Sequence, residues 1–129
     1  MQWQKNTQLI DANVILRYLL NDHAEMSPAA KTLISSGNTY TKPEIIAEVI
    51  YVLKRVYQIE RSNIKNFIHS LLNDISCNEA ECVLLAIDIY ASLSLDFVDC
   101  LLVAYHKINH ENVFSFDKKL NNLLSKEAD

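Results

Sequence analysis

The chain has 129 residues, a common length for one globular domain and too short for two ordinary hydrophobic cores. Apolar residues make up 50% and charged residues 22%, so the chain can bury a core and has no compositional sign of disorder. The formal net charge of −4 argues against a general nucleic-acid coat protein, which draws its affinity from basic surface. It leaves room for a metal-dependent nuclease, because the active site of such an enzyme is itself acidic.

Neither a membrane span nor a signal peptide is expected. Every long apolar run is broken by a charged residue before it reaches the length of a span, and the N-terminal residues do not have a signal-peptide pattern. Three cysteines, Cys77, Cys82 and Cys100, are an odd number without a framework spacing and are expected to be free thiols. We therefore expect a cytoplasmic protein with no membrane partner.

Strand and helix patterns alternate from the start of the chain. A short apolar run over residues 8–10 predicts a strand, and residues 12–22 have the apolar spacing of a helix. A second helix is expected over residues 27–36, with Ser27 as its N-cap and Gly37 just beyond its end.

The middle of the chain predicts a brief strand followed by the clearest helix. The strand covers residues 39–41, and the helix begins at Pro43 and runs to about residue 58. Its apolar arc is centred near Val49 and Val56.

The remaining segments continue the alternation. They are a helix over residues 61–74 with Ser62 as a cap, a strand over 75–77, helices over 78–93 and 96–109, a strand over 113–116 and a closing helix over 118–126. Strands that alternate with helices predict a parallel sheet, because parallel neighbours need crossover connections. The expected fold is a three-layer α/β/α single domain over residues 1–129, with a short central parallel sheet flanked by helices.

Two acids stand directly after predicted strands. Asp11 follows the first strand and Asp117 follows the last. In open parallel sheets, ligands bind outside the carboxyl ends of the strands, so these two side chains meet if both strands lie near the sheet centre. Each could instead be a helix N-cap, since Asp is a preferred residue there.

Two further acids border the predicted core. Glu48 falls beside the apolar arc of the helix that begins at Pro43, although a solvated flank is the simpler interpretation. Asp99 lies among apolar residues of a helix expected to be largely buried, where an unpaired charge would be costly. A divalent Mg²⁺ or Mn²⁺ ion would neutralise such a group of carboxylates and could activate water for phosphoryl chemistry.

Four segments in order, LIDANVILRYLL, PEIIAEVIYVL, DFVDCLLVA and VFSFD, resemble the motifs of the PIN-domain family, and within it the VapC-type toxins. The resemblance covers the whole chain. It implies a PIN-like fold and a magnesium- or manganese-dependent endoribonuclease of a type II toxin-antitoxin system, with an RNA substrate, a cognate antitoxin partner and a homodimer as the expected assembly.

Matched by motif, the resemblance gives a set of site residues. The catalytic and metal-binding acids are Asp11, Glu48, Asp99 and Asp117, with Asp96 as a further candidate ligand and Asn13 and Ser115 as supporting polar residues. Asp96 could instead be an N-cap or a first-turn acid favoured by the helix dipole.

Two alternatives stay open at this point. One is a non-catalytic PIN-like module that binds protein or RNA. The other is a nuclease that acts on DNA, since the same metal chemistry cleaves any phosphodiester. The carboxylates predict the metal site, whereas the RNA substrate depends on the family resemblance.

Overall fold

The computed structural model describes residues 7–126 and divides into two compact units, the first through Ala80 and the second from Glu81 onward. The first unit contains β1 (Gln8–Leu9), α1 (Ala12–Leu20), α2 (Met26–Ser35), β2 (Thr39–Thr41), α3 (Pro43–Arg55), α4 (Arg61–Asp74) and β3 (Ser76–Cys77). The second contains α6 (Phe97–Asn109), α7 (Lys118–Leu124) and nearly all of α5 (Ala80–Ser92), which begins at the boundary.

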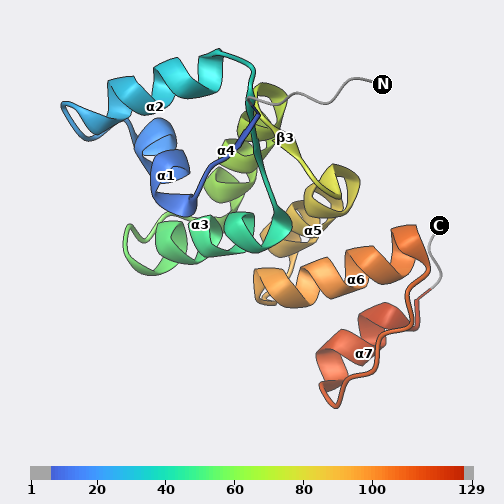
Figure 1. Cartoon of the computed structure of the whole chain (residues 1–129). Helices are drawn as coiled ribbons and strands as arrows, with labels where there is room; N and C mark the ends of the chain where they lie inside the picture. The colour runs from blue at the N-terminus through green and yellow to red at the C-terminus, as the bar shows by residue number, and fades with distance from the viewer. Residues whose placement is uncertain (1–6, 127–129) are drawn as a thin grey trace, which may run out of the picture. The chain divides into compact units, whose positions relative to one another are not determined.

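The three strands of the first unit form one parallel sheet in the order β1-β2-β3 (Figure 1). Helices α1 and α2 connect β1 to β2, and α3 and α4 connect β2 to β3. The predicted α/β class, with a short parallel sheet flanked by helices, is confirmed.

Helix α3 supplies much of the core of the first unit, but with a different face from the one predicted. Ile46, Val49, Ile50 and Leu53 are at most 2% exposed, whereas Val56 is 66% exposed. The buried face follows the neighbours that cover it, and α3 packs against α1 and α4. Its apolar arc is therefore centred on Val49 and Ile50, and the prediction for Val56 was wrong.

Two predicted helix caps were also wrong. Helix α2 begins at Met26 after Glu25, and the Ser27 hydroxyl instead donates to the carbonyl of Arg17 at 2.8 Å. Ser27 is thus a buried link between α1 and α2. Helix α4 follows Glu60 rather than Ser62. Gly37, beyond the end of α2, has φ +79°, which fits its predicted place after the helix.

An arginine joins three parts of the first unit. The Arg17 guanidinium of α1 lies 2.7 Å from the Asp22 carboxylate and donates to the Tyr57 hydroxyl at 3.1 Å. Both partners are close to helix ends, so this side chain holds the turn after α1 near the C-terminal end of α3.

In the second unit, α6 packs against α7, as Figure 1 shows. The rings of Tyr90 and Phe97 meet edge to face, with their centroids 6.3 Å apart, and Leu120 of α7 is 2% exposed. The Lys119 ammonium group donates to the Ser94 carbonyl at 3.0 Å. These contacts tie α7 to the connection between α5 and α6.

The predicted strand over residues 113–116 is not a strand in the structure. Its polar groups bond locally instead: the Ser115 carbonyl accepts from the Asn121 side-chain amide at 2.8 Å. Phe114 and Phe116 are 82% and 90% exposed, with ring centroids 5.0 Å apart. Local side-chain bonds of this kind compete with strand pairing. Within residues 7–126, no helix is long and apolar enough to cross a membrane.

Candidate active site

Asp11 lies at the carboxyl end of β1, as predicted. The N–H of Ile10 donates to the carbonyl of Tyr40 at 3.0 Å, so strand pairing continues to the residue before Asp11. The Asp11 Oδ1 atom then accepts the N–H of Val14 at 3.1 Å and caps α1. The carboxylate is exposed and has further lone pairs. Capping and cation binding are therefore compatible at this residue.

Glu48 approaches the same end of the sheet from α3. Helix α3 starts directly after β2, and β2 is parallel to β1, so its first turns lie at the edge that carries Asp11. Glu48 is exposed on the second turn, with Val49 and Ile50 buried beside it. The prediction that Glu48 borders the core was wrong, and its carboxylate is open to solvent.

Thr41, at the carboxyl end of β2, is a polar residue that the sequence did not single out. Its side chain is fully buried, and its hydroxyl has no hydrogen-bond partner among residues 7–126. Threonine is common in strands, so the sequence contains no signal for this unsatisfied hydroxyl.

Two carboxylates of the second unit, those of Asp96 and Asp117, act on the charge of Asp99. Asp99 is half-buried in the first turn of α6. Burial raises the pKa of Asp99, and the negative charges of Asp96 and Asp117 raise it further. Both acids therefore lie close enough to disfavour the charged form of Asp99, and a divalent cation would relieve this repulsion.

Asp96 and Asp117 hold different positions at their helix starts. Asp96 occupies the N-cap position of α6, but its side chain makes no capping hydrogen bond. Asp117 does cap α7, accepting the N–H of Leu120 at 2.9 Å. The hydroxyl of Ser115 accepts the N–H of Asp117 at 3.0 Å, so Ser115 fixes the turn that leads to this carboxylate.

Asn13, the other predicted supporting residue, is exposed in the first turn of α1. Its side-chain amide donates to the sulfur of Met26 at 3.9 Å. The structure thus directs Asn13 toward α2. Within either unit, residues 7–126 contain no group of three or more His, Cys, Asp or Glu placed to hold a metal ion.

Comparison with known proteins decides the family. The PIN domain family model matches residues 9–124 of this chain. The chain belongs to the PIN domain family. A curated relative, the VapC ribonuclease of Aquifex aeolicus (strain VF5), is 28% identical over 123 residues, which cover 90% of this chain and 91% of the relative. No solved structure matches the chain.

The donor set of this PIN domain suits a hard divalent cation. The predicted acids Asp11, Glu48, Asp99 and Asp117 all fall inside the matched residues. Carboxylate oxygens are the ligands that Mg²⁺ and Mn²⁺ prefer. Burial and two like charges disfavour the charged form of Asp99, and such an ion would stabilise it.

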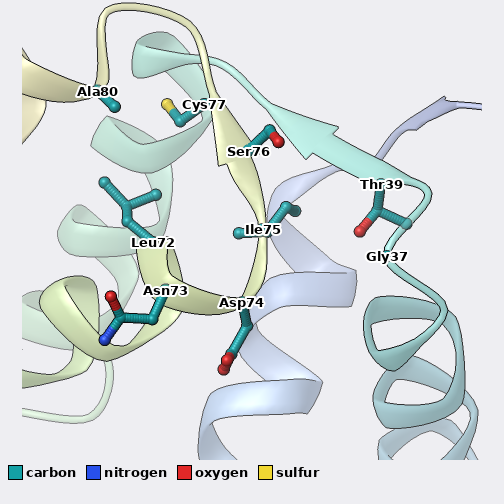
Figure 2. Close-up of a pocket in the computed structure, with 9 residues that line it drawn as sticks. All are labelled: Gly37, Thr39, Leu72, Asn73, Asp74, Ile75, Ser76, Cys77 and Ala80. Carbon is teal, nitrogen blue, oxygen red and sulfur yellow. The ribbon is translucent and has the colours of Figure 1, made fainter. Parts of the chain in front are cut away.

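The first unit of the PIN domain also has a pocket of about 380 Å³ beside β3 (Figure 2). Residues from the end of α4, from β3 and from the start of β2 line it, among them Asp74, Thr39 and Cys77. None of the predicted site acids does. Burial and the nearby Glu44 charge raise the pKa of Cys77 to about 11, so this thiol is not a reactive nucleophile.

Proposed function

We propose that this PIN domain is a divalent-metal-dependent endoribonuclease and the toxin component of a VapBC-type toxin-antitoxin pair. The relative from Aquifex aeolicus is named a VapC ribonuclease and aligns with nearly the whole chain, which supports this activity. The observation that carries the proposal is the half-buried carboxylate of Asp99, whose charged form is disfavoured by burial and by the negative charges of Asp96 and Asp117.

The proposed ligands are Asp11, Glu48, Asp99 and Asp117, with Asp96 as a possible further ligand. Asp11 and Glu48 come from the first unit, and the other acids come from the second. We propose that residues 1–129 act as one domain, because the PIN domain family model matches residues of both units, from 9 to 124. Bound Mg²⁺ or Mn²⁺ would activate water and stabilise the leaving oxygen of the phosphodiester.

The remaining residues of the proposed site have positioning roles. Ser115 holds the backbone of Asp117, and the capping bonds of Asp11 and Asp117 fix one oxygen of each carboxylate. Asn13, in the first turn of α1, is proposed to steady a carboxylate or a water molecule. The expected partners are an RNA substrate, a cognate antitoxin and a second copy of the chain, in the cytoplasm.

The decisive experiment uses purified full-length protein freed of any partner. Labelled RNA and labelled single-stranded DNA are incubated with Mg²⁺, with Mn²⁺ or with EDTA. We expect RNA cleavage that requires the metal and is abolished by Asp99→Asn. Glu25→Gln is the matched control, because Glu25 precedes α2 without making a capping bond. Cleavage in EDTA, full activity of Asp99→Asn, or cleavage of DNA alone would overturn the proposal.

A further inference from the structure

One exposed row of side chains runs along α3 and is not explained by the core. Glu44, Glu48, Tyr51 and Arg55 are all exposed and are spaced by four, three and four residues. This spacing puts them on one face of the helix. We refer to these four residues as the α3 row. Its first half is acidic and includes the proposed ligand Glu48, whereas its second half is aromatic and basic.

Tyr51 and Arg55 form a pair within the row. The Arg55 guanidinium carbon lies 5.5 Å from the centroid of the Tyr51 ring, and Tyr51 is 60% exposed. A guanidinium over an aromatic ring attracts the ring and restricts the motion of both side chains. The pair therefore presents a partly ordered planar surface with a positive charge.

We propose that the Tyr51–Arg55 pair binds unpaired RNA nucleotides next to the metal site, with Tyr51 stacking a base and Arg55 contacting a phosphate. This inference depends on the proposed function, since it takes RNA as the substrate at Glu48. Tyr51 lies one helical turn from Glu48 and Arg55 lies two turns from it, a rise of about 10 Å. A strand bound on the pair would lead directly to the metal site.

The chemistry of the pair selects an unpaired strand. Aromatic rings bind bases by stacking, and a base inside a duplex has both faces covered by its neighbours. The ring stands on the exposed face of α3, where an unpaired base can reach it. Arg55 can in addition stack on a base plane or contact a phosphate.

The same row fits a hydrophobic protein partner poorly. The residues one turn from Tyr51 on this face, Glu48 and Arg55, are both charged and exposed. Glutamate is depleted at protein interfaces, so the acidic half of the row disfavours such a partner. A ring between the proposed metal ligand Glu48 and the guanidinium of Arg55 suits a single RNA strand. Such a strand has bases that stack on the ring and phosphates that contact the metal and the guanidinium.

The test measures RNA binding separately from cleavage. Full-length Asp11→Asn protein, which should not cleave, is titrated in Mg²⁺ against a short fluorescein-labelled oligoadenylate, alone or annealed to oligouridylate. We expect tighter binding of the single strand. On the same background, Tyr51→Ala and Tyr51→Leu should weaken this binding by about five- to hundredfold, whereas Tyr51→Phe should retain it.

Salt dependence tests Arg55. Arg55→Ala should lower the slope of log Kd against log salt by about 0.7, the value expected for one lost phosphate contact on a single strand. Arg55→Lys should restore the slope. Lys31→Ala, which removes an exposed positive charge from α2, should leave both the affinity and the slope unchanged.

Each outcome separates this inference from the proposed function. If the unsubstituted chain cleaves RNA with metal but Tyr51→Leu binds oligoadenylate as well as the parent does, the α3 row inference fails alone. Equal binding of duplex and single strand also overturns it. If the chain does not cleave RNA but oligoadenylate binding still depends on the Tyr51 ring, the proposed activity is wrong and the inferred RNA-binding role of the pair is supported. Absence of oligoadenylate binding overturns the surface.

Discussion

The hydroxyl of Ser115 accepts a 3.0 Å hydrogen bond from the backbone N–H of Asp117. Asp117 in turn caps α7 through the N–H of Leu120, and the Ser115 carbonyl accepts from the Asn121 amide. These three bonds fix the turn in which Asp117 lies. The direction of a proposed metal ligand thus depends on a serine that need not touch the metal.

Removal of the Ser115 hydroxyl should affect activity more than folding. Ser115→Ala is expected to lower RNA cleavage by about 10-fold, because residues that position metal ligands have effects of this size. The free energy of unfolding should fall by only about 1 kcal/mol, the value of one hydrogen bond. Cleavage rates and denaturant unfolding measure the two effects. Ser115→Thr keeps the hydroxyl and is the control, and equal activity of Ser115→Ala and the unsubstituted chain would contradict the prediction.

Two substitutions should separate the role of Asp11 as a helix cap from its proposed role as a metal ligand. Asn is as good an N-cap as Asp, so Asp11→Asn should keep the thermal stability while abolishing metal-dependent cleavage. Asp11→Ala should lose both the activity and about 1 kcal/mol of stability. Thermal unfolding in EDTA measures the cap, and RNA cleavage in Mg²⁺ measures the metal site. An active Asp11→Asn protein would exclude Asp11 as a ligand.

Asp99 should make the metal-free protein less stable as the pH rises. The pKa of Asp99 is raised in the fold, so the native state holds this proton more tightly than the unfolded chain does. Stability is therefore lost as the pH rises from the ordinary Asp value of 3.8 to neutrality. Asp99→Asn removes the charge and should gain a few tenths of a kcal/mol at neutral pH, the size of a like-charge helix pair.

The measurement is urea unfolding of both proteins in EDTA at several pH values. The difference in free energy of unfolding between Asp99→Asn and the unsubstituted chain should grow with pH, since other groups cancel in this difference. Mg²⁺ should stabilise the unsubstituted chain more than the variant. A difference that stays constant from acid to neutral pH would contradict the prediction.

Substitution of Tyr18, which lies outside the proposed site, should change stability without changing activity. Its hydroxyl donates to the Asp74 carboxylate at 2.6 Å, which joins α1 to the end of α4. This hydrogen bond, followed by burial, raises the pKa of Tyr18 above its ordinary value of 10.0. Tyr18→Phe should cost about 1 kcal/mol at neutral pH and leave RNA cleavage unchanged.

The sign of the pKa shift gives this prediction a second test. Because the folded-state pKa is raised, the contribution of Tyr18 is fully present below pH 10.0 and is lost as the pH rises further. The stability difference between Tyr18→Phe and the unsubstituted chain should therefore shrink in alkaline solution. Urea unfolding of both proteins below and above that pH measures this difference. A difference that grows in alkaline solution would contradict the prediction.

Much of the local structure was predictable because it depends on short-range patterns. Turn residues and apolar spacing located the seven helices and three strands that residues 7–126 form, with ends shifted by a few residues. Asp11 and Asp117 could also be singled out, since each stands between a predicted strand and a predicted helix. The family match confirmed the resemblance to the PIN-domain family.

What the sequence could not determine depends on neighbours distant in the chain. Periodicity predicts a helix over α3, but only packing against α1 and α4 buries Ile46 and Ile50 and leaves Val56 exposed. That rotation also puts Glu48 in the exposed α3 row. Residues 113–116 have a strand-like composition, yet Ser115 bonds to α7, because strand formation requires a partner that local sequence does not specify.

The sequence by itself therefore determined which acids are present, at which ends of helices and strands they stand, and to which family the chain belongs. The tertiary structure decided how each carboxylate is used. It showed that Asp11 and Asp117 cap helices, that Asp99 is half-buried near the like charges of Asp96 and Asp117, and that Glu48 is exposed one helical turn from Tyr51. The physical reason is that capping bonds and charge repulsion depend on distances between atoms, which residue order alone does not fix.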